Sequence, residues 1–242
     1  MCLTVAGSDS GGAAGVAADL ATFAALGVHG ACVITAVTAQ DTTGVHRIHP
    51  VPHEVVVAQL DAVLADLDPA TVKTGMLADP RVVRLVAERC ADRVLVVDPV
   101  LRATSGAILA DDAVLRTYRR HLLPVACVST PNAEEDEALG WRGTPVIRTG
   151  GGAADLLLRP GVEPLWIEHD RVDTTNDHGT GCTYSAALAA FLAQGHELPV
   201  AARRAGGYTV DQLRLGSDWD LGRGRGPIAH LHPTSLTGRG TA

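Results

Sequence analysis

Aromatic residues are scarce in this sequence: three Trp, three Tyr and two Phe amount to 3% of 242 residues. A folded core must therefore rest mainly on Val, Leu and Ala. No apolar run approaches the roughly 20 residues that a membrane-spanning helix needs. A basic-then-apolar leader is also missing, since the chain runs at once into the strand-like segment 3–6. We therefore expect no membrane anchor and no secretory signal.

An excess of positive charge is absent as well. The 20 Lys and Arg residues are outnumbered by 27 Asp and Glu residues, which gives a formal net charge of −7. This balance argues against a surface for nucleic acid or for an anionic membrane. An anionic substrate would therefore have to be bound by donor groups gathered at one site, because the net charge of the protein does not attract it.

Closely spaced cysteine pairs are missing too. The five cysteines are odd in number and far apart, and no two of them form a CxxC pair. This pattern favours reduced thiols in the cytoplasm over a disulfide framework or a zinc site. The length and the soluble, globular composition allow one α/β domain with a sizeable core, although two smaller domains would also fit.

Short Val/Ile/Leu runs alternate with Ala/Leu-rich helical patterns along the chain. This alternation predicts a mostly parallel sheet that is covered by helices on both faces. The predicted strands cover residues 3–6, 31–36, 71–74, 93–97, 126–130 and 146–149. The predicted helices cover 53–67, 80–90 and 111–122, and a further one ends at Leu26 before Gly27.

Small or polar residues follow five of the predicted strands. These strand ends are Gly7-Ser8-Asp9, Thr38-Ala39-Gln40, Lys73-Thr74-Gly75-Met76, Asp98-Pro99-Val100 and Thr130-Pro131-Asn132. In sheets of this type ligands bind beyond the carboxyl ends of the strands. Five polar ends in one register therefore predict one shared site.

The segment 177–183, Asp-His-Gly-Thr-Gly-Cys-Thr, places a glycine-rich turn where an apolar helix begins. A helix N-terminus exposes unpaired N–H groups and the positive end of a dipole, so it binds anions such as phosphate. The same field is expected to lower the pKa of the Cys182 thiol, which could then act as a thiolate or proton acceptor. A helix-capping turn with a buried, inert cysteine is the alternative.

These residues together resemble the ribokinase-like superfamily and, more narrowly, the hydroxymethylpyrimidine/phosphomethylpyrimidine kinases of thiamin biosynthesis. The matching segments are AGSDSGG (6–12), ADL (18–20), VITAVTAQ (33–40), KTGML (73–77), VDPV (97–100), SG (105–106), TPN (130–132) and HGTGCT (178–183). They occur in family order and span nearly the whole chain. The Cys after the Gly-Thr-Gly turn points to this branch and to the related pyridoxal kinases.

The resemblance implies an α/β fold, a ribokinase-like three-layer αβα sandwich with a mostly parallel central sheet. It also implies one kinase domain over residues 1–242, with 232–242 as a flexible tail. The implied reaction moves the γ-phosphoryl group of ATP, with Mg²⁺, to 4-amino-5-hydroxymethyl-2-methylpyrimidine and to its monophosphate. In such a transfer a protein mainly positions groups and neutralises charge.

Roles for individual residues follow from the same resemblance. Gly179, Thr180 and Gly181 would donate backbone N–H groups to the phosphoryl group in flight, and Cys182 would accept or guide the hydroxyl proton. The pyrimidine pocket would comprise Gly7, Asp19, Gln40, Met76 and Val100, with the Gln40 amide facing the aminopyrimidine edge. Asn132 and Thr149 would lie on the nucleotide side, and Asp98 and Glu135 would hold Mg²⁺.

Several of these residues also have ordinary interpretations. Asp19 could be a solvated charge on a helix, Gln40 a turn residue and Met76 a core side chain. Asp98 before a proline could be structural. Lys73 could be a phosphate partner or a surface charge, and the sequence does not choose between them.

The chain also departs from the usual family pattern. Ala13 stands where a Gly is common, and lysines that are common in the family are replaced by Thr104 and Thr149. Asp177 adds a negative charge beside the phosphate turn, as a helix cap or as a group that repels phosphate. The stretch 132–179 also looks shortened. These departures make the nucleotide side less certain than the fold.

Three alternatives to the double kinase activity stay open. The chain could be a pyridoxal kinase of the same branch, or it could phosphorylate only the monophosphate. It could also be a degenerate homologue that binds a pyrimidine or a nucleotide without turnover. Family members are often dimers, and the sequence leaves homodimer formation open.

Overall fold

Eight strands form one sheet in the computed structural model of the protein, which describes residues 1–103, 106–107, 109–150 and 152–230. Six neighbouring strands run parallel, in the order β2 (Gly30–Ile34), β1 (Cys2–Ala6), β5 (Thr71–Thr74), β6 (Val94–Val97), β7 (Val128–Ser129) and β8 (Val146–Arg148). β9 (Ala154–Arg159) and β10 (Val162–Glu168) extend the sheet beyond β8 in antiparallel pairing. The carboxyl ends of the parallel strands therefore meet at one edge of the sheet, where loops can build a site.

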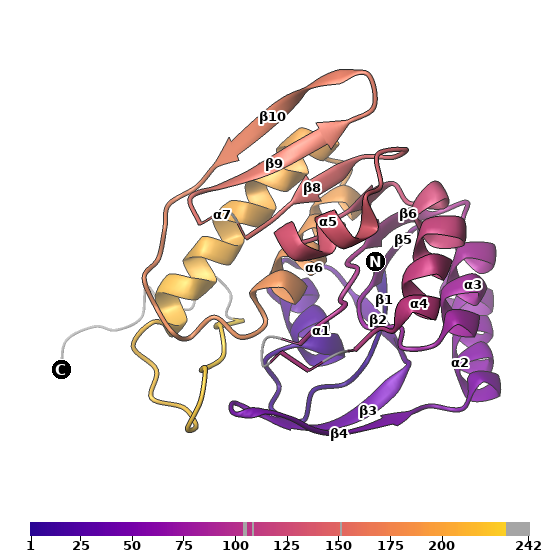
Figure 1. The fold of residues 1–242 in the computed structure, drawn as a ribbon, viewed down its shortest axis with the longest axis horizontal. Coiled ribbons are helices and arrows are strands. Elements are labelled where there is room, and N and C mark those ends of the chain that lie inside the picture. Colours follow the sequence, from indigo (N-terminus) through magenta and orange to yellow (C-terminus); the bar gives the residue numbers. More distant parts are fainter. Residues whose placement is uncertain (104–105, 108, 151, 231–242) are drawn as a thin grey trace.

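Helices cover both faces of this sheet (Figure 1). One face packs against α1 (Gly15–Ala25), α6 (Thr180–Ala193) and α7 (Leu198–Gly216). The opposite face packs against α2 (His53–Asp66), α3 (Pro80–Arg89) and α4 (Asp112–Thr117). A π-helical turn (Tyr118–Leu122) and a 3₁₀ turn (Leu123–Val125) follow α4 on the same face. The helix α5 (Ala133–Leu139) adds Leu139 to this core. The arrangement is the predicted three-layer αβα sandwich.

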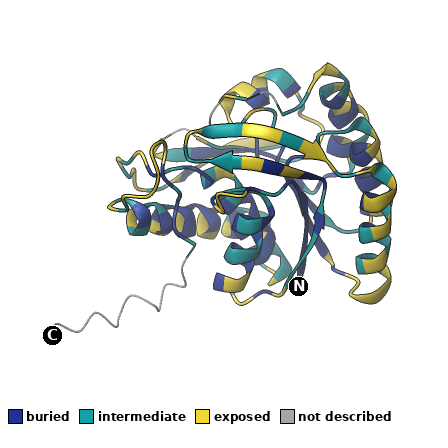
Figure 2. Ribbon diagram, turned by 90° about the horizontal axis from the view of Figure 1, so that it is seen from below, coloured by how far each residue is buried: buried dark blue, intermediate teal, exposed yellow. Residues whose placement is uncertain are grey.

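Alternate residues of each strand supply the two cores. In β6, Leu95 and Val97 pack on the side of α2 and α3, whereas Val96 packs on the side of α6 and α7. This follows from the two-residue period of a strand. Figure 2 shows buried residues along the sheet and on the inward sides of the helices. Of the few aromatic side chains, Phe23 and Tyr118 are fully buried, while Val, Leu and Ala make up most of both cores.

A separate hairpin stands beside the sheet at the site edge. The predicted strand 31–36 ends at Ile34, and the chain pairs again as β3 (Ala36–Asp41) with β4 (Gly44–Pro50), antiparallel to each other. Thr35 makes the break, because its N–H donates to the Ala6 carbonyl and its hydroxyl donates to the Met76 carbonyl at 2.6 Å. The hairpin carries Gln40, so its position decides what that amide can reach.

The predicted elements agree with the structure where the pattern is long and local, as in α2, α3, β1 and β5. The predicted helix 111–122 changes to a π-helical turn after Thr117, and the predicted strand 126–130 shortens to two residues. The hairpin and the strands β9 and β10 were missed. Residues 232–242 lie outside the described part of the chain, so the single-domain boundaries and the tail stay a prediction. No helix that the structure describes is long and apolar enough to span a bilayer.

Candidate active site

A cavity of about 800 Å³ lies at the carboxyl ends of the parallel strands. All five polar strand ends expected from the sequence contribute to its lining, through residues that include Ser8, Gln40, Met76, Asp98 and Asn132. The N-terminus of α6 also opens into it, through residues 179–182. The cavity therefore joins the two features that the sequence suggested separately, the shared edge and the phosphate turn.

Four residues that the resemblance assigns to a pyrimidine pocket lie in the lining of the cavity. Gly7, Met76, Val100 and Gln40 all line the cavity, as predicted for the pyrimidine pocket. A Cβ atom on Gly7 would meet Met76 Cε at 2.4 Å, so only glycine leaves the methionine side chain in this position. Met76 is 8% exposed and supplies a soft, polarisable wall. Such a surface suits a small planar ring.

Gln40 is held in place through both its backbone and its side-chain amide. Its backbone N–H donates to Ser10 Oγ at 2.8 Å, and Ser10 Oγ donates to the Gln40 carbonyl at 2.6 Å. Its side-chain Nε2 lies 2.8 Å from His178 Nε2. The same histidine nitrogen is 3.4 Å from Asp9 Oδ2. The hairpin is thus connected through Gln40 and His178 to the glycine turn that follows β1.

Asp9 and His178 are site residues whose roles the sequence analysis missed, although both lie in motifs that it quoted. Asp9 Oδ1 accepts from the Gly11 N–H, and its Oδ2 accepts from the N–H groups of Ala13 and Ala14 at 3.1 and 2.9 Å. Burial opposes the charged form, but these bonds and His178 together lower the pKa of Asp9. A carboxylate that follows a strand and precedes several small residues was the available signal.

The phosphate turn has the geometry that its sequence predicts. Gly179 is the N-cap of α6 with φ +92°, and a Cβ there would meet the Ala13 carbonyl oxygen at 1.8 Å. The open surface at Gly181 leaves a ligand free to approach the backbone. The Thr180 hydroxyl donates to the Asp177 carbonyl and closes the turn. The Thr180 N–H also donates to the Asp177 carbonyl at 3.2 Å, so the anion-binding end of α6 is formed by the next N–H groups, those of Gly181 and Cys182.

Asp177 does not present a free negative charge to this turn. Its two carboxylate oxygens accept from Nε and Nη2 of Arg225. Arg225 belongs to the glycine-rich segment 222–227, which also bonds to the hairpin through the N–H groups of Arg223 and Gly224 and the hydroxyl of Thr42. The expected repulsion of phosphate by Asp177 is thus offset within the chain.

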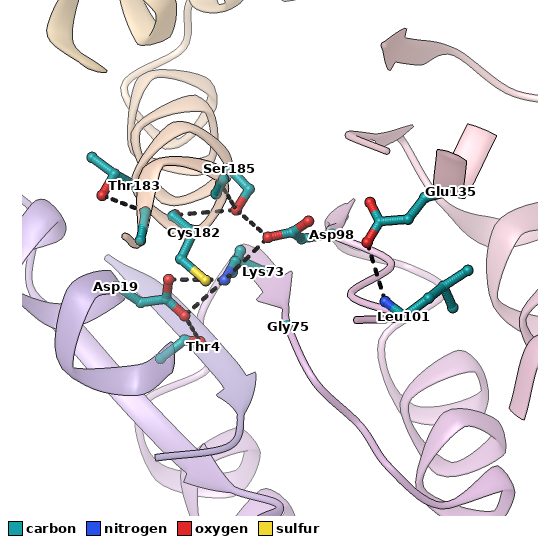
Figure 3. Close-up of polar contacts among 12 residues, drawn as sticks. Thr4, Asp19, Lys73, Gly75, Asp98, Leu101, Glu135, Cys182, Thr183 and Ser185 are labelled. Atoms are coloured by element: carbon teal, nitrogen blue, oxygen red, sulfur yellow. Dashed lines mark hydrogen bonds and ion pairs between the residues drawn. The ribbon is translucent and has the colours of Figure 1, made fainter. Parts of the chain in front are cut away.

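Lys73, the only lysine in the sequence, lies fully buried beneath the turn (Figure 3). Its Nζ donates to Asp19 Oδ1 and Oδ2 at 2.8 and 2.9 Å and is 3.9 Å from Asp98 Oδ2. Thr4 donates to the same Asp19 carboxylate at 2.5 Å. Burial would lower the pKa of Lys73, but Asp19, Cys182 and Asp98 together raise it. The ammonium therefore stays charged.

This arrangement corrects two expectations. Asp19 was predicted to line the pyrimidine pocket, yet its carboxylate is 0% exposed and paired with Lys73, and it is not among the described residues that line the cavity. A solvated surface charge is equally wrong for it. Lys73 is neither a surface charge nor positioned to bind a ligand directly, because its side chain has no exposed area.

The expected pKa shift of Cys182 is also wrong in direction. Burial raises the pKa of the thiol to about 12, with Asp98 and Asp19 acting in the same direction. Lys73 and the N–H group of Gly15 oppose this without reversing it. Cys182 nevertheless lines the cavity, and Figure 3 shows its sulfur beside the Lys73 ammonium. With this pKa the group is a thiol at neutral pH.

The two carboxylates assigned to Mg²⁺ both line the cavity and both are buried. Asp98 Oδ2 accepts from the Ser185 hydroxyl at 2.9 Å. Glu135 accepts from the N–H groups of Leu101 and Asn132, and with Asn132 it forms the capping box of α5. Burial and then Asp98 raise the pKa of Glu135 to about 7. A bound cation would offset the repulsion between the two carboxylates and favour their charged forms.

The described residues hold no cluster of three or more His, Cys, Asp or Glu side chains able to bind a metal. Mg²⁺ in phosphoryl-transfer sites is commonly held by only one or two protein carboxylates together with substrate phosphates. Asp98 and Glu135 therefore fit a phosphate-bound Mg²⁺ rather than a metal site built from protein alone.

On the nucleotide side, Asn132 and Thr149 both line the cavity. The Thr149 N–H donates to the Pro131 carbonyl, which keeps this loop next to the N-terminus of α5. Thr104, one of the departures from the family pattern, lies outside the described residues. Arg102 also lines the cavity and adds a cation that the sequence analysis did not identify, whereas Arg148 is not among the described lining residues.

Comparison with known proteins agrees with this geometry. The family model described as phosphomethylpyrimidine kinase matches residues 9–144 and 142–229. A hydroxymethylpyrimidine/phosphomethylpyrimidine kinase of Synechococcus elongatus is 40% identical over 96% of this chain and 98% of the relative. The pyridoxal kinase from Staphylococcus aureus in complex with ADP superposes with a TM-score of 0.87 at 29% identity, covering 97% of this chain and 94% of that chain. For a phosphomethylpyrimidine kinase from Clostridium difficile 630 the TM-score is 0.75 at 32% identity, with 87% and 97% covered.

The buried pair of Lys73 and Asp19 generates a stability prediction. Asp19→Ala should lower the free energy of unfolding by about 3–5 kcal/mol, because the ammonium stays buried without its partner. Asp61→Ala, which breaks an exposed ion pair with Arg89, is the control and should change stability little. Urea unfolding measures both, and the double variant Asp19→Leu/Lys73→Met should recover most of the loss. Equal losses for Asp19→Ala and Asp61→Ala would contradict the assigned role.

Proposed function

We propose that this chain, which belongs to the phosphomethylpyrimidine kinase family, transfers the γ-phosphoryl group of ATP to hydroxymethylpyrimidine and to its monophosphate. One observation carries the proposal: the phosphate turn of α6 opens into the same cavity as a small ring pocket formed by Gly7, Gln40 and Met76. A phosphoryl group at the turn would then lie between an acceptor at that pocket and a donor in the remainder of the cavity.

The acceptor ring would lie against Met76 and Val100, with its edge towards Gln40. An amide presents both a donor and an acceptor, and an aminopyrimidine edge presents the complementary pair. The contact between Gln40 and His178 restrains the position of the amide, since the histidine itself lies near Asp9. The hydroxymethyl group would then point towards the turn and Cys182.

The turn stabilises charge on the group being transferred. The N–H groups of Gly179, Gly181 and Cys182 and the positive end of α6 would bind the phosphoryl oxygens without reorganising, whereas the Thr180 N–H already donates to the Asp177 carbonyl. Asp98 and Glu135 would hold Mg²⁺, directly or through water, and the ion would neutralise charge on the donor phosphates. Arg102, which also lines the cavity, would add a further positive charge near these phosphates.

We assign the acceptance of the hydroxyl proton to the Cys182 sulfur, which lines the cavity beside the turn. With a thiol pKa of about 12, the thiolate is scarce at neutral pH but strongly basic. Lys73 stabilises that thiolate, since its ammonium lies close to the sulfur. The thiolate would take the hydroxyl proton as the new O–P bond forms and the bond between the γ-phosphorus and the bridging oxygen of ATP breaks, with ADP as the leaving group. The resulting thiol would return the proton to solvent after product release.

We place the enzyme in the cytoplasm, because all five cysteines are free and the reaction uses ATP. A second candidate activity, pyridoxal kinase, is favoured by the higher TM-score with the Staphylococcus aureus pyridoxal kinase than with the Clostridium difficile phosphomethylpyrimidine kinase.

ADP release from Mg-ATP tests the proposed activity. We expect turnover with hydroxymethylpyrimidine and with its monophosphate, and less with pyridoxal, because Gln40 complements an aminopyrimidine edge. Turnover with pyridoxal alone would favour the second candidate activity, pyridoxal kinase. No turnover with any of the three, from folded protein, would reject the kinase assignment.

Gln40→Ala should raise the KM for the pyrimidine by about ten-fold while changing kcat less, since the amide binds the ring equally in the ground and transition states. Steady-state kinetics at saturating ATP measure the split. Val37→Ala, an exposed change on the same hairpin, is the control and should leave both constants as in the wild type. An unchanged KM in Gln40→Ala would remove this residue from the pocket.

Cys182→Ala should lower kcat by about 10²-fold or more, which is the usual contribution of a positioned base. Because the thiolate is the active form and the thiol pKa lies above the working range, kcat of the wild type should rise with pH between 7 and 9. That rise should disappear in Cys182→Ala, whose circular dichroism should match the wild type. A flat wild-type profile together with full activity of the variant would reject Cys182 as the base.

A further inference from the structure

The segment 222–230, which follows α7, lies against the phosphate turn. The His178 N–H donates to the Gly226 carbonyl at 3.0 Å, and the Ile228 N–H donates to the His178 carbonyl at 3.0 Å. The two stretches therefore pair in the manner of parallel strands on either side of His178. The backbone of segment 222–230 thus restrains the turn that would bind the phosphoryl group.

Two side chains of the same segment add contacts to this region. Arg225 Nε donates to Asp177 Oδ1 at 2.7 Å, directly before the turn. His230 Nε2 lies 3.0 Å from the hydroxyl of Thr183, in the first turn of α6. Segment 222–230 therefore contacts the chain before, within and after the phosphate turn.

The start of this segment is bound to the tip of the hairpin β3–β4. The N–H groups of Arg223 and Gly224 both donate to Thr42 Oγ1 at 3.1 Å, and Thr42 lies between the two strands of the hairpin. A Cβ atom at Gly222 would meet Thr42 Oγ1 at 2.3 Å, and one at Gly224 would meet the Thr42 carbonyl oxygen at 2.0 Å. Only glycine at these two positions allows so close an approach. Figure 1 shows the segment, in yellow, beside the hairpin.

The hairpin needs such a contact to stay in place. It forms a two-stranded sheet of its own, and a hairpin of this size is only marginally stable in water by itself. Its bond between the Ser10 hydroxyl and the Gln40 backbone is exposed to solvent. Because Gln40 precedes Thr42 by two residues, a hairpin tip that moved away from segment 222–230 would displace the amide from the pyrimidine pocket.

We propose that segment 222–230 positions the acceptor pocket against the phosphate turn, and that Thr42 is the positioning residue through which it acts. By accepting two backbone N–H groups, the Thr42 hydroxyl holds the hairpin where the Gln40 amide reaches the ring. The proposal rests on the proposed function, because that ring is the pyrimidine to be phosphorylated. A protein whose binding-competent state is only partly populated binds its ligand more weakly by that fraction. Thr42 therefore controls the affinity for the pyrimidine and not that for ATP.

Thr42→Val tests this role, because it keeps the shape of the side chain and removes the oxygen that accepts both N–H groups. The KM for hydroxymethylpyrimidine should rise by about five-fold or more, since the hairpin spends less time in the binding position. The KM for ATP and kcat should stay near the wild-type values in steady-state kinetics. Thr42→Ser keeps the hydroxyl and should restore the low KM for the pyrimidine.

Arg223→Ala is the matched control. It removes an exposed side chain from the same segment but keeps the backbone N–H that donates to Thr42, so all constants should match the wild type. The double variant Gln40→Ala/Thr42→Val separates positioning from a merely structural role. If Thr42 acts through Gln40, Thr42→Val should raise the KM little further once the amide is gone. Effects of the two changes that multiply independently would overturn the proposal, as would an unchanged KM in Thr42→Val.

Failure of the kinase assignment gives a different result. If no pyrimidine is phosphorylated, amide hydrogen exchange followed by mass spectrometry still measures how firmly the hairpin is held. Amides of residues 36–50 should exchange faster in Thr42→Val than in the wild type and in Arg223→Ala, while those of β1 and β5 should not change. Equal exchange of the hairpin in all three proteins would overturn the role of Thr42, whatever reaction the protein performs.

Discussion

The buried ammonium of Lys73 is the charge on which the site depends. It lies at the end of β5 and contacts Asp19 of α1, while Asp98 after β6 and Cys182 of α6 face it within the same network (Figure 3). Four segments that are far apart in the sequence are thus connected by one ion-pair network. A buried charge is tolerated only with well-placed partners, so these segments cannot shift independently. The phosphate turn is therefore held at a fixed position above the sheet edge.

Because the turn is held in place, different parts of the cavity would bind different parts of the two reactants. The Gln40 side of the cavity is connected to the turn through His178 and Asp9, and residues of α7 also line the cavity. Acceptor, transferred group and donor would each meet a different element, which is what in-line transfer between two bound molecules requires. Loops with small residues form the walls, and the parallel strands supply the rigid support.

Local signals in the sequence were enough for much of this. The turn at 177–183 and the helix 53–67 are specified by neighbouring residues, and both have the predicted conformation. Asp19 was misassigned because its partner Lys73 is 54 residues away and only the folded sheet brings them together. The pKa of Cys182 was misjudged for the same reason: the helix dipole is local, but burial and Asp98 are tertiary effects. Arg225, which offsets Asp177, lies 48 residues away.

A crystal structure with a non-hydrolysable ATP analogue, Mg²⁺ and hydroxymethylpyrimidine tests the central claim most directly. The account predicts the terminal phosphate within hydrogen-bonding distance of the N–H groups of Gly179, Gly181 and Cys182, with the hydroxymethyl oxygen between that phosphate and the Cys182 sulfur. The pyrimidine edge should face Gln40. Phosphates bound away from the N-terminus of α6, or a pyrimidine outside the pocket of Gly7 and Met76, would contradict it.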